Sequence, residues 1–148
     1  MIRIAEGAFE PGAALTAFIG SCPVEAGGVA SFTGLVRADP GSGLDALTLE
    51  HYPGMTERLL AAIEAEALAR WKLAQIHIIH RVGRMRPGEA IVFVATASAH
   101  RQAAQESCAF LVDWLKTKAP FWKLEETAQG ERWVEAKAAD DAAAASWG

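Results

Sequence analysis

The segment Lys116-Thr-Lys-Ala-Pro-Phe-Trp-Lys123 constrains the fold most strongly, because its proline forces a change of secondary structure. Pro120 has no backbone N–H and disfavours the α conformation at the residue before it, so a helix running through Lys116 must end here. The chain then continues through two aromatic residues to Lys123. Two interpretations remain open: the lysines stay solvated and complement the helix dipole, or one with a lowered pKa acts as a nucleophile or acid/base.

The remaining patterns alternate between strand and helix. Strands are predicted at 2–5, 29–36, 44–52, 76–80, 90–97, 121–127 and 132–134, and helices at 11–19, 59–71 and from an N-cap at Ser98 to Lys118. This order predicts an α+β fold rather than a doubly wound one, with 1–148 forming a single domain. The alanine-rich segment 136–148 is expected to be a short helix or, more simply, a flexible C-terminal tail.

Composition narrows the class of protein. Apolar content of 51% and charged content of 22% are ordinary for a soluble globular protein. A net charge of −4 argues against general nucleic-acid binding, yet it permits a locally basic pocket for a small anion. The two cysteines, Cys22 and Cys108, have no metal or disulfide spacing, and no signal or membrane-spanning pattern is present, so we expect a cytoplasmic protein.

Cationic residues occupy two positions where anions commonly bind. His100 and Arg101 lie where a strand becomes a helix, and their charge opposes the helix dipole unless an anion binds there. Arg37 ends another strand beside a glycine-rich loop, and its guanidinium suits a phosphate or carboxylate. Either arginine could equally be an ordinary surface residue. His51, His77 and His80 are interpreted as structural, and the latter two should face opposite sides of one strand.

Six segments carry a family resemblance. They are Phe-Thr-Gly-Leu-Val-Arg37, Leu47-Thr-Leu-Glu-His-Tyr-Pro-Gly-Met55, Ile79-His-Arg-Val-Gly83, Ser98-Ala-His-Arg101, Leu115-Lys-Thr-Lys-Ala-Pro-Phe-Trp-Lys123 and Arg132-Trp-Val-Glu135. In this order they resemble the large, catalytic subunit of molybdopterin synthase, the MoaE family. The resemblance spans nearly the whole chain.

The resemblance implies an α/β-hammerhead fold with a mainly antiparallel sheet and a sulfurtransferase activity. The enzyme would convert cyclic pyranopterin monophosphate to molybdopterin during molybdenum cofactor biosynthesis. Sulfur would arrive as a thiocarboxylate on the C-terminal Gly-Gly of a small ubiquitin-like subunit. No metal or other cofactor would then be needed, and no cysteine of this chain would be catalytic.

The resemblance also implies roles for individual residues. Lys116 and Lys123 would be catalytic and would contact both the thiocarboxylate and the pterin. The residues that would bind the phosphorylated substrate are Arg37, His100 and Arg101, with Leu35, Val36, Leu124 and Glu125 as further candidates. Lys118 is left out, because it falls on the apolar side of the helix end.

Helix geometry predicts that the active site is shared between two copies of the chain. Arg101 and Lys116 are fifteen residues apart on one predicted helix, which places their Cα atoms about 22 Å apart. That distance is too long for one small pterin, so His100 and Arg101 of one protomer should face the lysines of another. A homodimer with one small subunit per site would form a heterotetramer.

Two alternative functions remain open for the chain. One is a non-catalytic scaffold that docks a ubiquitin-like partner, and the other is a hydrolase or acyltransferase that uses Cys22.

Overall fold

The computed structural model describes residues 1–118, 121–134 and 138–148. Its strands are β1 (Ile2–Ala5), β2 (Gly28–Leu35), β3 (Leu44–Glu50), β4 (Gln75–Arg81), β5 (Gly83–Met85), β6 (Ala90–Ser98), β7 (Trp122–Thr127) and β8 (Gly130–Val134). Its helices are α1 (Pro11–Ser21), α2 (Met55–Arg70), α3 (Arg101–Lys118) and α4 (Ala138–Ala145). The strands form two sheets, in the orders β1-β4-β6-β2 and β5-β3-β7-β8.

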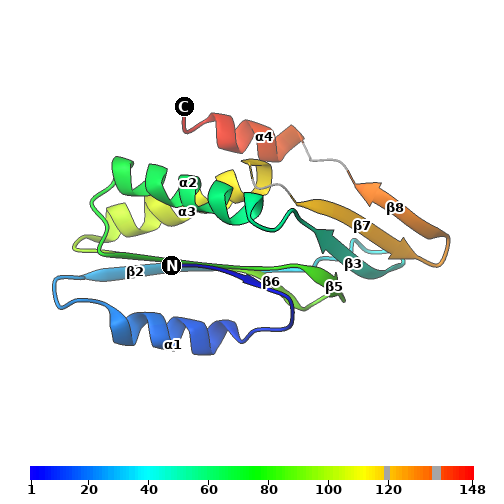
Figure 1. The fold of residues 1–148 in the computed structure, drawn as a ribbon, viewed down its shortest axis with the longest axis horizontal. Coiled ribbons are helices and arrows are strands. Elements are labelled where there is room, and N and C mark those ends of the chain that lie inside the picture. The colour runs from blue at the N-terminus through cyan, green and yellow to red at the C-terminus, as the bar shows by residue number, and fades with distance from the viewer. Residues whose placement is uncertain (119–120, 135–137) are drawn as a thin grey trace.

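The first sheet is covered by helices on both faces (Figure 1), with α1 on one side and α2 and α3 on the other. Alternation along β4 and β6 explains this arrangement. Ile78 and Val94 pack in the core beneath α2 and α3, whereas Ile79 and Phe93 pack in the core beneath α1. Strands buried on both faces are apolar almost continuously, as the sequence of β6 is.

Helix α3 lies along β2 and β6 and carries its apolar face toward them. Its buried residues recur at helical spacing and include Ala104, Cys108, Leu111 and Leu115. A side-chain hydrogen bond fixes the helix on the sheet, because the buried Thr96 hydroxyl donates to the carbonyl of Ala104 at 2.6 Å. The two ends of α3 are therefore held at opposite ends of the first sheet.

The second sheet begins where the first one ends. Strand β4 continues almost directly into β5, which pairs with β3 in the second sheet. A small core of Val36, Leu49 and Met85, with Phe121 packed against it, joins the two sheets. Apart from the parallel pair β1–β4, the strand pairings of the described residues are antiparallel, which confirms the α+β class and the mainly antiparallel pairing.

One strand was missed, and one local expectation was wrong. Strand β5 was not predicted, because three residues are too few for a period-2 pattern. Ser98 does not cap α3: it ends β6, and its hydroxyl donates to the carbonyl of Lys72. The helix starts at Arg101, later than the sequence suggested.

The C-terminal segment includes a short helix, which was one of the two structures expected for it. Residues 136 and 137 lie outside the described residues, and α4 follows them. Beyond α4, the Trp147 indole N–H donates to Asp113 at 2.7 Å, while Arg70 donates to the Trp147 carbonyl at 2.6 Å. The Trp147 ring also meets the rings of Trp71 and Phe110 edge to face. The flexibility expected for 136–148 stays a prediction.

We expect Trp147→Ala to lower the free energy of unfolding by about 2–4 kcal/mol, because it removes both the aromatic packing and the bond to Asp113. Urea denaturation of the full chain measures this. The matched control is Trp133→Ala, since Trp133 is 55% exposed and should cost less than about 1 kcal/mol. Equal costs for the two variants would show that the segment is flexible and contributes nothing.

Candidate functional site

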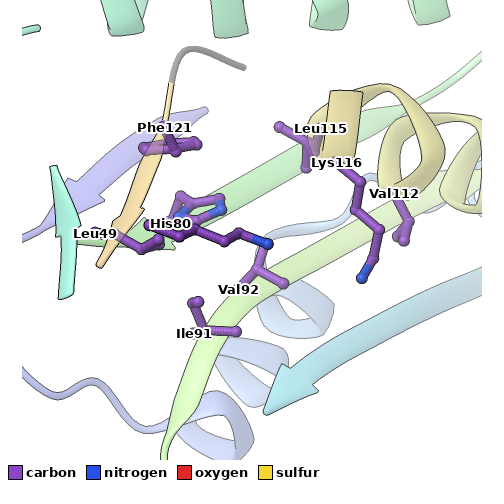
Figure 2. Close-up of a pocket in the computed structure, with 9 residues that line it drawn as sticks. Leu49, His80, Ile91, Val92, Val112, Leu115, Lys116 and Phe121 are labelled. Carbon is purple, nitrogen blue, oxygen red and sulfur yellow. The ribbon is translucent and has the colours of Figure 1, made fainter. Parts of the chain in front are cut away.

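A cavity of about 90 Å³ lies where the two sheets meet the C-terminal end of α3. Its walls are Leu49, Ile91, Val92, Val112, Leu115 and Phe121, and its polar side chains are His80, Lys116 and Lys123. Figure 2 shows these side chains arriving from both sheets and from α3. The cavity is therefore apolar, with three nitrogen-bearing groups around it.

Secondary structure explains how the two lysines reach one cavity. Val112, Leu115 and Lys116 are three and four residues apart on α3, so they share one side of the helix. Lys123 lies directly across β7–β3 from the cavity residue Leu49. Lys118 lies elsewhere, with its ammonium 4.9 Å from the centre of the Trp114 ring. Ala119 and Pro120, which were expected to end the helix, lie outside the described residues.

His80 forms part of the cavity and is almost fully buried. Its ring stacks on Phe121, with centroids 4.0 Å apart and planes at 21°. Its Nδ1 lies 3.0 Å from the carbonyl oxygen of Arg81. Because a carbonyl can only accept, Nδ1 carries the proton in this bond.

The surroundings of His80 keep its ring uncharged. Burial above all, helped by the charges of Lys123, His51 and Lys116, lowers the pKa of His80 to about 4, although the bond to Arg81 acts in the opposite direction. A neutral ring protonated at Nδ1 leaves Nε2 as a hydrogen-bond acceptor. The cavity thus holds two donors that are cationic when protonated and one neutral acceptor.

His80 is the functional candidate that sequence reasoning missed. It was interpreted as structural together with His77, and the prediction that these two residues face opposite sides is confirmed: His77 meets Phe93 on the α1 side. Alternation also places His80 on the side of Ile76 and Ile78, beneath α3. The position of His80 on the α3 side of its strand, together with the lysines at the end of α3, was the sequence pattern that could have identified this residue.

The expected anion-binding residues lie outside this cavity. Arg37 is exposed and forms an ion pair with Asp39 at 2.9 Å, so a phosphate would have to compete with that carboxylate. His100 and Arg101 are exposed at the start of α3. Their position depends on Gly27, since a Cβ there would clash with the carbonyl oxygen of Ala99.

Within one chain these cations form two groups. Gly28 lies against the backbone of Arg101, while Leu35, at the other end of β2, pairs with Ala90 beside the cavity. The seven residue steps between them correspond to about 23 Å. Arg37 therefore belongs to the cavity end of the molecule, and His100 and Arg101 belong to the opposite end.

The remaining candidates have varied surroundings. Val36 is buried in the core that joins the sheets, Leu35 is exposed, and Glu125 pairs with Arg132 at 3.6 Å. Leu124 is half-buried and pairs with Trp133 across β7–β8. None of these four residues lines the described cavity.

The two cysteines and His51 do not line the cavity. Cys108 is buried in the α3 core, and burial raises its pKa to about 11. Burial also raises the pKa of Cys22, which packs beside Phe18 on the α1 side. Nδ1 of His51 lies 3.0 Å from the Thr56 hydroxyl.

Metal-binding and membrane-spanning features are absent from the described ranges 1–118, 121–134 and 138–148. No group of three or more histidine, cysteine or acidic residues in them could hold a metal ion. No helix in this part of the chain is long and apolar enough to cross a membrane.

Comparison with known proteins agrees with the motifs. Residues 4–118 match the family model described as MoaE protein. The chain is 52% identical to the molybdopterin synthase catalytic subunit of Pseudomonas aeruginosa over 99% of this chain and 97% of that protein. It is 54% identical to the subunit of the same name from Escherichia coli, covering 83% of each. The solved molybdopterin biosynthesis MoaE protein of Burkholderia ambifaria aligns with a TM-score of 0.83 and 48% identity, covering 99% and 97%.

We expect burial of neutral His80 to make stability depend on pH. The pKa of His80 is about 4 in the folded chain and 6.5 ordinarily, so between these values the unfolded chain binds more protons. The free energy of unfolding must then fall as pH falls, by about 2 kcal/mol from pH 7 to pH 5 for this residue. Urea denaturation at both pH values should show this loss in the wild type and a much smaller loss in His80→Phe. Identical losses would contradict the assignment.

Proposed function

The chain belongs to the MoaE family, and on this premise we propose that it is the catalytic subunit of a molybdopterin synthase. It acts as an enzyme of molybdenum cofactor biosynthesis in the cytoplasm, with its 148 residues forming one domain. Specifically, it is a sulfurtransferase that converts cyclic pyranopterin monophosphate to molybdopterin. The sulfur comes from the thiocarboxylated C-terminal glycine of a small ubiquitin-like subunit.

The observation that carries this proposal is the convergence of Lys116 and Lys123, from different elements, on one narrow apolar cavity. A terminal thiocarboxylate is small, flat and negatively charged, and two ammonium groups beside an apolar cavity attract such an anion. The cavity of about 90 Å³ suits a glycine end, whereas small-molecule sites usually measure about 300–1,000 Å³. The pterin therefore binds outside the cavity, at its mouth.

The lysines can serve the chemistry in two ways. An ammonium group beside the carrier's carbonyl stabilises the negative charge that develops on oxygen when a nucleophile attacks the carbonyl carbon, before sulfur leaves. Lys116 can also donate a proton, or act as a nucleophile once it is deprotonated. In each transfer the sulfur bonds to the pterin, and water then hydrolyses the bond between that sulfur and the carrier's carbonyl carbon. An ordinary carboxylate is left on the carrier, so two charged carriers supply one dithiolene.

In this proposal, cations from two copies of the chain bind the phosphate of the pterin. Arg37 lies at the cavity end of its own protomer, and His100 and Arg101 of a second protomer complete the site in a homodimer. The distance along α3, about 22 Å between Arg101 and Lys116, supports this division. Addition of one small subunit to each site gives a heterotetramer.

Replacement of either cavity lysine should abolish turnover without unfolding the chain. We expect Lys116→Ala and Lys123→Ala each to lower the rate of dithiolene formation by about 100-fold or more, as the loss of a transition-state donor does. The assay combines the chain with thiocarboxylated carrier and cyclic pyranopterin monophosphate. Lys118→Ala is the matched control, because Lys118 lies over Trp114 and should keep near wild-type turnover.

The same variants separate the rival functions. A non-catalytic scaffold would leave dithiolene formation unchanged in Lys116→Ala. A hydrolase or acyltransferase using Cys22 would lose activity in Cys22→Ser, whereas the sulfurtransferase proposed here would keep it.

Complementation tests the shared site. Arg101→Ala and Lys116→Ala homodimers should each be inactive, but mixed dimers contain one site with both residues intact. Mixing them should restore activity, up to roughly a quarter of the wild-type level for random subunit exchange with one intact site in each mixed dimer. Mass spectrometry of tagged subunits confirms the exchange. If exchange is complete and activity does not return, all these residues act within one protomer.

A further inference from the structure

The cavity has an unequal supply of hydrogen-bond donors and acceptors. Lys116 and Lys123 provide only donors when protonated. His80 uses its Nδ1–H on the carbonyl of Arg81, so its Nε2 is the side-chain acceptor among the described residues that line the cavity. A ligand that matches this set must carry an anion and, beside it, an N–H group.

A chain end in Gly-Gly has this combination. Its terminal group is the anion, and the N–H of its last peptide bond lies two bonds from the terminal carbon. A peptide N–H that enters an apolar cavity without finding an acceptor loses its bonds to water, and this weakens binding. The lysines cannot satisfy that N–H, because an ammonium group has no lone pair.

We propose that Nε2 of His80 accepts a hydrogen bond from the N–H of the last peptide bond of the carrier tail and thereby positions the terminal thiocarboxylate between Lys116 and Lys123. This inference rests on the proposed function, and it assigns His80 as a positioning and specificity-determining residue. Tails that end in proline or in an N-methylated residue lack the N–H and should be rejected.

The surroundings of His80 fit this role. Stacking on Phe121 and the bond to Arg81 fix the plane and the tautomer of the ring. A protonated ring could not accept, and the pKa of about 4 keeps the ring neutral at physiological pH. The ionisable groups whose charges act on it are Lys123 from β7, Lys116 from α3 and His51 from the segment between β3 and α2.

The test compares two short synthetic peptides with the same sequence, one ending in Gly-Gly and the other in Gly-N-methylglycine. Calorimetric titration of the full chain measures both affinities in wild type, His80→Phe and His77→Phe. The phenyl ring introduced by His80→Phe keeps the stack on Phe121 but has no acceptor, and His77 is the matched control, a buried histidine on the opposite face of the same strand. We expect N-methylation to weaken binding roughly tenfold in wild type and His77→Phe, and less than about twofold in His80→Phe.

The outcomes distinguish this inference from the proposed function. An equal effect of N-methylation in wild type and His80→Phe overturns the role of His80, while binding that depends on Lys116 leaves the proposed function intact. If neither peptide binds wild type even at millimolar concentration, the tail does not use this cavity and both proposals fail.

A measurement on the wild type avoids dependence on the folding of His80→Phe. In chain labelled with nitrogen-15 at histidine, the ring resonances of His80 should show a proton on Nδ1 and none on Nε2. The Nε2 resonance should shift when the Gly-Gly peptide is added and shift much less with the N-methylated peptide. A proton on Nε2, or equal shifts with both peptides, contradicts the proposal.

Discussion

The packing of α3 along the first sheet is the constraint on which the rest of the site depends. Its buried residues hold the helix against β2 and β6 along its length, and the Thr96–Ala104 hydrogen bond fixes its position. A helix held in this way cannot bend to bring its two ends together. The cations at its N-terminus and the lysine at its C-terminus are therefore separate features, and a second copy of the chain is the simplest means of combining them.

The cavity at the other end of α3 gains its electrostatic character from apolar surroundings. Six apolar side chains line the cavity beside the exposed residues Lys116 and Lys123, and in the proposed function an anion inside it would be screened less by water than on the open surface. The same conditions act on His80, whose ring becomes harder to protonate because it is buried beside two cations. In the proposed function, the same environment would favour both the binding of the anion and the neutral acceptor beside it.

Local patterns in the sequence predicted most of the strands and helices. The features that were missed depend on contacts between segments far apart in the sequence. The period-2 runs and the spacing of α3 gave the elements, and the family resemblance singled out both lysines. Strand β5 and the stacking of His80 on Phe121 could not be predicted, because each depends on the junction between two sheets. Likewise, nothing in the sequence near Arg37 indicates that Arg101 lies at the far end of β2, since only the register of the strands gives that distance.

The chemistry of the cavity also explains why the sulfur would be carried by a partner. A thiol acts as a nucleophile only as thiolate, and burial raises the pKa of Cys108 to about 11 and keeps it in the core. Cys22 packs on the α1 side, away from the cavity, so no cysteine of this chain reaches the lysines. In the proposed function, the narrow cavity would accept one chain end with the larger substrate at its mouth, so that the reactive sulfur would arrive already attached. The chain then has to supply only position and charge, which are the two properties that its fold fixes.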